Sequence, residues 1–321
     1  MTLTLRDLLS RRGDPLQLEP LTGELGLDRP VPDPEVASPG LALAGYTSRF
    51  MPRRLHVLGE TEISYLRELE APERRSRLEK FFAFELPCVF VTKGQEVPSE
   101  LLDLARVRGI PLIRSKLKTA EFYRRIKPIM EEAFAPRTTM HGSLADVYGV
   151  GLLFIGQSGI GKSECVLDLV ERGHRLVADD IVQVTRRGSD ILIGMGHELA
   201  AHHMEIRGVG LIDIPTLFGV RSVRQQKRIE VIVQLEAWDT AKDADRTGLQ
   251  TLETTVLDVV LPRVIVPLNP GKNITVISEV VAMMHLLRYS GVDVAAAFNE
   301  RLIKKMKEKR GLREYLVEDY E

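Results

Sequence analysis

Short apolar runs alternate with amphipathic stretches over the first part of the chain, a pattern typical of an α/β layer. The predicted strands are 41–45, 54–59, 87–92 and 110–113. The predicted helices are 61–69, 72–82, 100–107 and 119–134. Ser99 is the expected cap of the third helix, and Pro128 should kink or break the fourth.

The second half carries more strand-like runs, with fewer helical stretches between them. The predicted strands are 150–155, 175–184, 190–194, 228–235 and 259–266. The predicted helices are 163–172, 275–289 and 294–309. Strict alternation in residues 228–235 is typical of a half-exposed antiparallel strand. With so few crossover helices, a standard doubly wound sheet is disfavoured. The pattern breaks at residues 135–139, so we expect two domains, 1–134 and 135–321.

Residues 156–163 spell G-x-x-x-x-G-K-S between a predicted buried strand and a predicted helix. The loop consists of Gly156, Gln157, Ser158, Gly159, Ile160, Gly161, Lys162 and Ser163. Its glycines let successive N–H groups point at one anion, and the helix N-terminus adds its positive dipole end. Lys162 can reach β- and γ-phosphates, and the Ser163 hydroxyl can ligate Mg²⁺. The loop predicts binding of a nucleoside triphosphate or phosphate, without specifying a reaction.

An acidic pair follows an apolar run beyond the loop helix. Asp179 and Asp180 lie 17 and 18 residues after Lys162, on a strand that should run beside the loop. Alternating side chains would let one carboxylate hold Mg²⁺ or its water while the other accepts a hydroxyl proton. The alternative is a solvated turn, which the nearby loop disfavours. His141, just before the loop strand, is either structural or catalytic.

A second polar segment precedes a flexible turn at Gly208 and Gly210. Glu205 and Arg207 stand at strand spacing on one face, where a carboxylate could complete Mg²⁺ coordination. A surface ion pair is the equal alternative. Arg246 follows an aspartate in a polar stretch typical of a mobile loop, and could stabilise a transferring phosphoryl group or remain solvated.

Composition narrows the class of protein further. The chain has 321 residues, 44% hydrophobic and 28% charged, with net charge −1, so nucleic acid is not an expected partner. Cys88 and Cys165 lack metal-site spacing, and the histidines at 197, 202 and 203 fit no zinc pattern. No apolar run reaches membrane-spanning length, and the N-terminus lacks a signal-peptide core. We expect a cytoplasmic protein without a membrane partner.

Several of these motifs occur together, and in order, in one known family. They are residues 140–142, 156–164, 172–176, 178–180, 205–210 and 245–246. In this combination the chain resembles bacterial HPr kinase/phosphorylase, the enzyme that modifies a serine of the sugar-transport phosphocarrier HPr. Residues 39–46 and 59–64 extend the resemblance into the N-terminal half, so it covers nearly the whole chain.

The resemblance implies a bifunctional serine kinase/phosphorylase that regulates carbon metabolism. Lys162 and the loop amides would hold ATP, pyrophosphate or inorganic phosphate, and Ser163 and Glu205 would ligate Mg²⁺. Asp180 would take the proton of the HPr serine in the kinase reaction. It would return that proton in the reverse reaction, in which phosphate attacks phosphoserine and pyrophosphate is released. His141 and Arg246 match the other catalytic positions.

The resemblance also assigns two longer segments. Residues 204–213 align with a segment used in both reactions, and residues 267–272 with one used mainly in dephosphorylation. The positions concerned in the second segment are Pro267, Asn269, Gly271 and Lys272. Asn269 stands where a basic residue is expected, and Lys272 where an arginine is expected. Because lysine cannot form a bidentate fork on phosphate, the reverse reaction should be weaker.

The implied fold is an N-terminal α/β domain followed by a P-loop kinase domain related to phosphoenolpyruvate carboxykinase, assembled as a homohexamer. Two alternatives stay open: a small-molecule kinase on the same core, and a non-catalytic nucleotide-sensing module. The match over the whole chain disfavours the first. The intact set of Lys162, Ser163, Asp180 and Glu205 disfavours the second.

Overall fold

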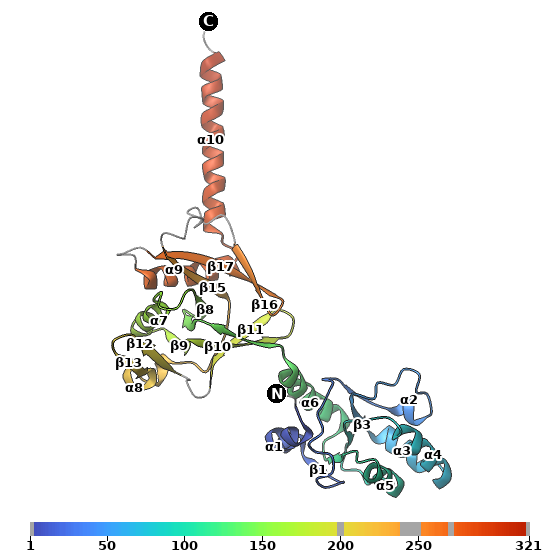
Figure 1. Cartoon of the computed structure of the whole chain (residues 1–321). Coiled ribbons are helices and arrows are strands. Elements are labelled where there is room, and N and C mark those ends of the chain that lie inside the picture. Colours follow the sequence, from blue (N-terminus) through green and yellow to red (C-terminus); the bar gives the residue numbers. More distant parts are fainter. Residues whose placement is uncertain (1–2, 198–201, 238–251, 269–272, 319–321) are drawn as a thin grey trace. The chain divides into compact units, whose positions relative to one another are not determined.

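The computed structural model describes residues 3–197, 202–237, 252–268 and 273–318, with side chains described outside 11–14 and 307–318. The chain divides into two compact units, Met1–Ala135 and Pro136–Glu321 (Figure 1). Each unit has its own buried clusters of hydrophobic side chains.

The N-terminal unit is a three-layer α/β fold around a five-stranded sheet of order β1-β5-β4-β3-β2. Strands β2 to β5 are parallel, and β1 is an antiparallel edge strand. The strands are β1 Leu18–Pro20, β2 Val36–Ala37, β3 Leu55–Leu58, β4 Val89–Val91 and β5 Leu112–Ser115. The helices are α1 Leu5–Leu16, α2 Gly40–Leu43, α3 Glu60–Glu68, α4 Ala71–Phe81, α5 Ser99–Val107 and α6 Thr119–Phe134.

Successive side chains of the central strands point to opposite faces of this sheet, and both faces are packed with hydrophobic residues. In β4, Val89 and Val91 pack with the cluster under α2 to α5, whereas Phe90 packs with the cluster under α1 and α6. Because both faces are covered by helices, the strands are continuous apolar runs, as is usual in parallel sheets.

Two local predictions in this unit are wrong, and of the kink or break expected at Pro128 the break does not occur. Residues 41–45 are not a strand, because Gly40–Leu43 forms the short helix α2 and buries Leu43 in the core. Ser99 is the first residue of α5 rather than its cap. The cap position is Pro98, and no side chain caps the helix. Helix α6 is not broken and continues through Pro128, with buried side chains before and after the proline.

The C-terminal unit contains a six-stranded sheet of order β16-β17-β15-β8-β7-β9, a four-stranded sheet of order β14-β11-β10-β6, and the hairpin β12-β13. The first strands are β6 Arg137–His141, β7 Ser143–Val147, β8 Val150–Ile155, β9 Arg175–Ala178, β10 Ile181–Arg187 and β11 Ile191–Gly196. The later strands are β12 His203–Ile206, β13 Gly210–Asp213, β14 Gln226–Arg228, β15 Val231–Ala237, β16 Leu252–Val256 and β17 Val259–Leu268. The helices are α7 Lys162–Glu171, α8 Ile214–Phe218, α9 Ile274–Tyr289 and α10 Val294–Glu318.

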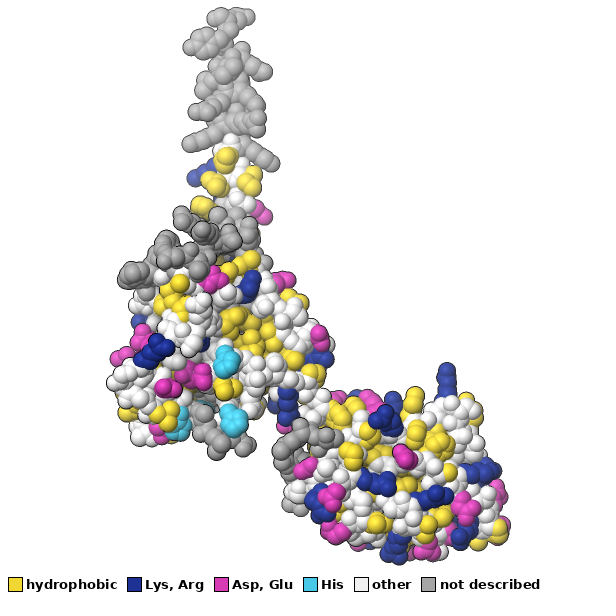
Figure 2. Space-filling view, in the orientation of Figure 1, with side chains coloured by type: hydrophobic (Ala, Val, Ile, Leu, Met, Phe, Trp, Pro, Cys, Tyr) yellow, Lys and Arg dark blue, Asp and Glu magenta, His cyan; other side chains and the backbone are white. Residues whose placement is uncertain are grey.

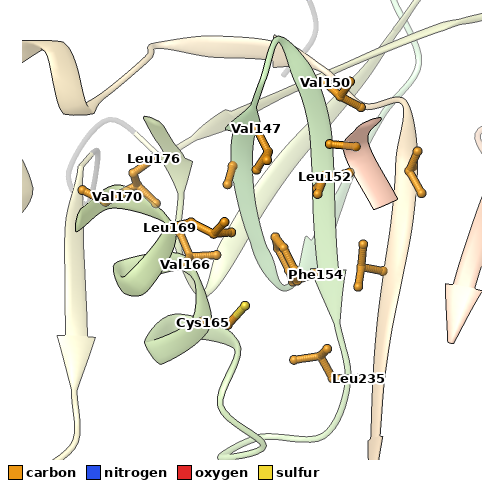
Figure 3. Packing of buried hydrophobic residues seen from close by; sticks show 14 of the residues in the cluster. Val147, Val150, Leu152, Phe154, Cys165, Val166, Leu169, Val170, Leu176 and Leu235 are labelled. Carbon is orange, nitrogen blue, oxygen red and sulfur yellow. The ribbon is translucent and has the colours of Figure 1, made fainter. Parts of the chain in front are cut away.

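Helices α7 and α9 cover one face of the six-stranded sheet. In this layer Val166 and Leu169 of α7 pack with Leu152 and Phe154 of β8 (Figure 3). A separate cluster, with Leu144, Leu153 and Val184 among its members, joins strands of the six-stranded and four-stranded sheets. The predicted buried strand 150–155 and the helix that follows the glycine-rich loop are therefore confirmed as β8 and α7.

Three strand predictions in this unit are wrong. Residues 228–235 do not form a half-exposed antiparallel strand, because β15 begins at Val231 and runs parallel to both β8 and β17. The misleading polar positions, Arg228 and Glu230, precede that strand. Strand β17 is not interrupted at Pro262, because there it pairs only with β16, and pairing with β15 begins one residue later.

The third wrong prediction is the single strand expected for residues 175–184, which contain the acidic pair of the candidate site. They form not one strand but two, in different sheets: β9 in the six-stranded sheet and β10 in the four-stranded sheet. Asp179 and Asp180 therefore lie at a corner between the sheets and not within a strand.

Helix α10 is longer than predicted, and its first turns expose hydrophobic side chains (Figure 2). The exposed residues are Val294, Phe298, Leu302, Ile303 and Met306. In the described part of the chain, no helix is by itself long and apolar enough to cross a membrane. The pair Ile274–Tyr289 and Val294–Met306, bent by 75°, meets the length and composition criteria only when taken together.

Candidate active site at the glycine-rich loop

The glycine-rich loop connects β8 to α7 in a conformation that requires glycine at several positions. Gly156, Gly159 and Gly161 have φ angles of 149°, 76° and 102°, a region that L-residues rarely adopt. A Cβ on Gly156 would also lie 2.6 Å from the carbonyl oxygen of Leu235. Gly161 occupies the N-cap position of α7, so the helix begins at Lys162 with its dipole directed at the loop.

Lys162 folds back over this loop. Its Nζ donates to the carbonyl oxygens of Gly156 and Gln157, over 3.2 and 3.1 Å. No carboxylate pairs with Lys162 in the described part of the chain. The ammonium group is therefore held at the loop by hydrogen bonds to two backbone carbonyls, which phosphate oxygens can replace.

A bent two-stranded ribbon brings the acidic pair to the loop. Strand β6 pairs with β10 in one sheet, and β7 pairs with β9 in the other. The β6–β7 segment and the β9–β10 segment therefore pass from one sheet to the other side by side. The corner residues Gly142 and Asp180 are joined by a hydrogen bond from the Gly142 N–H to the Asp180 carbonyl oxygen, over 3.0 Å. Position 142 requires glycine, since a Cβ there would overlap the carbonyl oxygen of Phe154.

Asp179 is the carboxylate fixed against the loop. Its Oδ1 accepts a hydrogen bond from Ser163 Oγ over 3.0 Å and another from Ser143 Oγ. Burial raises the pKa of Asp179, and the bonds from Ser143 and Ser163 oppose that rise. Ser143 is fully buried, which fixes its hydroxyl. It was not among the predicted site residues, and the only signal was its position directly after Met140-His141-Gly142.

Asp180 and His141 lie beside one another on the exposed side of the corner. The distance from His141 Nδ1 to Asp180 Oδ1 is 3.9 Å, and the two side chains are 84% and 82% exposed. Asp180 has a φ of 62°, which aspartate tolerates better than most residues. The two carboxylates of the pair thus face different ways, as predicted, but a turn rather than strand alternation is the reason. Asp180 is open to a large substrate.

The hairpin β12-β13 packs on α7 and carries the segment predicted to serve both reactions. Met204 is buried in the core, and Glu205 lies on the opposite, exposed face of β12. No hydrogen bond joins Glu205 to Ser163 within the described residues, so the role of Glu205 as a metal ligand stays a prediction. The Arg207 guanidinium lies over the loop: a Cβ on Gly159 would be 2.5–2.8 Å from its atoms.

Gly208 lies in the turn of this hairpin and Gly210 begins β13, with φ angles of 83° and 100°. Their positive φ explains the Gly-x-Gly sequence, since the turn closes directly after Arg207. Of the remaining predicted site residues, Pro267 lies near the end of β17, opposite Glu236 of β15. Arg246, Asn269, Gly271 and Lys272 lie outside the described residues.

The residues at the loop fit a magnesium ion held jointly with phosphate. Ser163 and Asp179 place a hydroxyl and a carboxylate oxygen 3.0 Å apart, and oxygen donors are what Mg²⁺ prefers. Within the described ranges, no group of three histidine, cysteine or acidic side chains could hold a metal ion by itself. The remaining coordination would come from water and phosphate oxygens, which is usual for Mg²⁺ at nucleotide sites.

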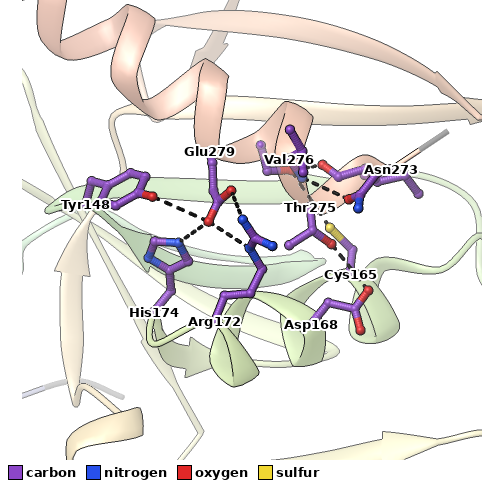
Figure 4. A network of polar contacts seen from close by, with 11 residues as sticks. Tyr148, Cys165, Asp168, Arg172, His174, Asn273, Thr275, Val276 and Glu279 are labelled. Atoms are coloured by element: carbon purple, nitrogen blue, oxygen red, sulfur yellow. Dashed lines mark hydrogen bonds and ion pairs between the residues drawn. The ribbon is translucent and has the colours of Figure 1, made fainter.

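A buried acid anchors the far end of the loop helix (Figure 4). Glu279 of α9 accepts hydrogen bonds from Arg172 Nε and Nη2 over 2.9 and 2.7 Å, and lies 3.1 Å from Nε2 of His174. The pKa of Glu279 is lowered to about 2, mainly by the hydrogen bonds from the Arg172 guanidinium. Tyr148 packs edge-on against His174, with ring centroids 4.7 Å apart. This cluster ties α7 and β9 to α9.

Both units of the chain match families of known proteins. The family model described as HPr Serine kinase N terminus matches residues 3–130, and that described as HPr Serine kinase C-terminal domain matches residues 132–302. The HPr kinase/phosphorylase of Chloroherpeton thalassium is 45% identical over 274 residues, or 85% of this chain and 81% of that protein. The HPr kinase/phosphorylase of Bacillus cytotoxicus is 43% identical over 287 residues, or 89% and 93% of the two chains.

A solved structure gives a shorter match. The Hpr(Ser) kinase/phosphatase from Coxiella burnetii is 32% identical, covers 51% of this chain and 99% of its own, and aligns with a TM-score of 0.45. The two family models and the long matches to curated relatives confirm the resemblance drawn from the motifs. The chain belongs to the HPr serine kinase family.

Proposed function

We propose that this chain transfers a phosphoryl group from ATP, or from pyrophosphate, to a serine of an HPr-type phosphocarrier protein. In the reverse direction, inorganic phosphate attacks the phosphoserine, and pyrophosphate and the free serine are the products. One observation carries the proposal: Asp179 is hydrogen-bonded to Ser163 of the glycine-rich loop, while its neighbour Asp180 is open to solvent beside it. Relatives that share both units are named HPr kinase/phosphorylase.

In the binding step, the loop amides and Lys162 hold the phosphates. The Lys162 ammonium exchanges its two backbone carbonyl contacts for phosphate oxygens. Arg207, which lies over Gly159, adds a second positive charge on the hairpin side of the loop. Arg246 would add a third, as the family resemblance implies.

In the transfer step, Asp180 accepts the proton of the attacking serine. Its carboxylate is exposed and can be reached by a side chain of another protein, which a buried base could not. Microscopic reversibility gives the same group the role of proton donor when phosphoserine is cleaved. His141 lies 3.9 Å from that carboxylate and is placed to orient it or the incoming serine.

Magnesium would be held by Ser163, with Asp179 directly or through its water shell, and it would neutralise charge on the phosphate oxygens when bound. Ser143 keeps Asp179 in place through the hydrogen bond that its buried hydroxyl donates to the carboxylate. Glu205 is the further ligand that the family resemblance implies.

Finer features of the proposal rest on the resemblance alone. They are the kinship of the C-terminal unit to phosphoenolpyruvate carboxykinase, a homohexameric assembly and a part in regulating carbon metabolism. A cytoplasmic location is the expectation drawn from the composition. Residues 267–272 would serve the reverse reaction, and Asn269 and Lys272 would make that reaction weaker than in relatives with two basic residues there.

The decisive experiment follows the phosphoryl group. The chain is incubated with γ-labelled ATP, Mg²⁺ and HPr, or HPr whose target serine is changed to alanine. We expect label on HPr and none on the alanine variant. Addition of phosphate to labelled phospho-HPr should then yield free HPr with an equal amount of pyrophosphate. Label in a small product but not on HPr would instead support a small-molecule kinase. ATP binding without transfer would support a nucleotide sensor.

A further inference from the structure

The motif in residues 39–46, which the catalytic site does not use, lines a cavity of about 180 Å³ in the N-terminal unit. The cavity lies between the segment that follows β2 and the segment that leads into β3. Core packing explains Ala42 and Leu43, which are buried. It does not explain Leu41 and Tyr46, which line the cavity and are 71% and 52% exposed.

His56 of β3 forms an inner wall of the cavity and is only 1% exposed. Its Nε2 lies 3.3 Å from the carbonyl oxygen of Pro52, and because a carbonyl can only accept, this contact puts the ring proton on Nε2. Nδ1 is then an acceptor, and it is buried without a hydrogen-bond partner among the described residues. Burial lowers the pKa of His56 to about 4, so the ring is neutral near pH 7.

An aromatic surface lies beside this unsatisfied acceptor. The Phe50 ring stacks on His56 with centroids 4.7 Å apart, and Phe81 meets the same imidazole edge-on. A planar group that entered the cavity would meet Phe50, which also lines it. A cavity of about 150 Å³ lined by apolar residues holds benzene, so this volume accommodates one ring-sized group.

The charges around the cavity are of one sign. Arg49 and Arg54 line it, and no aspartate or glutamate does. Within the described part of this unit, neither arginine forms an ion pair, and Arg54 Nε is buried without a hydrogen-bond partner. The carboxylate of Glu62 close by is already bound by Ser38 Oγ and by the N–H of Gly59. An anion is the partner that satisfies the two guanidinium groups.

We propose that the N-terminal unit binds a small organic anion in this cavity: a carboxylate or phosphate monoester that carries one ring-sized group. The ring lies against Phe50, and the anion pairs with Arg54 and Arg49. This site is separate from the glycine-rich loop, which belongs to the other unit.

Binding is tested on the full-length chain by titration calorimetry and saturation-transfer NMR. The probes are 4-hydroxybenzoate and phenyl phosphate, with 4-hydroxybenzyl alcohol as the uncharged control. A Lys162→Ala background keeps phenyl phosphate away from the loop. We expect a Kd of about 1 mM or tighter for at least one anion, and at least tenfold weaker binding of the alcohol. Preference between the two anions tells whether the natural ligand is a carboxylate or a phosphate ester.

Two variants in the cavity and one outside it complete the test. Arg54→Gln and Arg49→Glu should each weaken anion binding about tenfold or more, whereas Arg221→Ala, an exposed arginine of the other unit, should not. Because Arg49 is exposed, its substitution leaves the fold intact even if Arg54→Gln does not. No binding of either anion at about 10 mM, or equal binding by wild type and Arg49→Glu, would overturn the proposal. Neither result depends on whether the chain phosphorylates HPr.

Discussion

The hydroxyl of Ser163 donates a hydrogen bond to Oδ1 of Asp179 over 3.0 Å, across the gap between the loop helix and the corner after β9. The two residues are 16 positions apart in sequence and belong to different elements. Their contact places a carboxylate at the glycine-rich loop, which is the arrangement that phosphoryl transfer with Mg²⁺ requires. It also distinguishes the two members of the acidic pair, because the Asp179 carboxylate accepts hydrogen bonds from two serines, whereas the Asp180 side chain is exposed.

Asp179→Asn should weaken the effect of Mg²⁺ on nucleotide binding. The amide keeps the shape of the side chain but loses the charge that attracts the cation. We expect ATP to bind without Mg²⁺ as in wild type, with the Mg²⁺-dependent gain in affinity reduced about tenfold or more. Fluorescent ATP analogues titrated with and without Mg²⁺ measure this. An unchanged Mg²⁺ dependence would remove Asp179 from the metal site.

Asp180→Asn should nearly abolish phosphoryl transfer in both directions and leave ATP binding unchanged. General acid–base catalysis contributes roughly 10²–10⁴-fold, so kcat for phosphorylation and for dephosphorylation should each fall by about that factor. Asparagine also tolerates the φ of 62° at this corner, so the backbone should not change. The Kd for ATP should change less than about twofold. A loss confined to one direction would contradict the single shared carboxylate.

Arg207→Ala should weaken the binding of ATP and pyrophosphate about tenfold, because the guanidinium lies over Gly159 of the loop. Arg207→Lys should restore only part of the affinity, since the ammonium cannot make a bidentate contact. Calorimetric titration gives both values. The exposed Arg221, changed to alanine, is the matched control for loss of one positive charge. Equal affinities for wild type and Arg207→Ala would show that the hairpin does not contact phosphate.

Glu279→Gln should loosen the connection between α7 and α9. The Arg172 guanidinium lowers the pKa of Glu279 to about 2, below its ordinary value of 4.5. The ionised carboxylate therefore stabilises the fold fully above about pH 4.5, and this contribution is lost as the pH falls toward 2. Its size is on the order of 1–2 kcal/mol, allowing for solvent screening of the half-exposed Arg172.

Hydrogen exchange of the α7 and α9 peptides measures this effect. At neutral pH, exchange should be faster in Glu279→Gln than in wild type. The exposed neighbour Glu171, changed to glutamine, should behave as wild type. As the pH falls from about 4.5 toward 2, wild type should approach the variant. A constant difference through that range would mean that packing, not the ion pair, links the two helices.

Local sequence was enough to predict the strand and the helix on either side of the glycine-rich loop. The apolar run before Gly156 and the helical spacing after Ser163 are properties of neighbouring residues, and β8 and α7 form where they were predicted. The need for glycine in the loop could also be inferred from local sequence, because a positive φ angle is a property of each position by itself. The motifs of the loop, the acidic pair and the Gly-x-Gly turn then sufficed to indicate the family.

The pairing of strands that are distant in sequence could not be predicted from local sequence. The alternation in residues 228–235 predicted an antiparallel strand, but parallel neighbours on both sides bury β15. A single strand was predicted for residues 175–184, but the chain changes sheets at the acidic pair. In both cases the pattern of one segment does not reveal which strands lie beside it, and those neighbours decide burial and direction.

The sequence by itself determined a glycine-rich loop between a buried strand and a helix, an α/β class, and the set of residues from which we propose that a phosphotransfer site is built. Only the tertiary structure decided which carboxylate lies against Ser163 and which remains accessible, and that Arg207 covers the loop. The physical reason is that these contacts depend on a ribbon bent between two sheets at Gly142 and Asp180. That bend comes from the packing of residues far apart in the chain, and no local pattern specifies it.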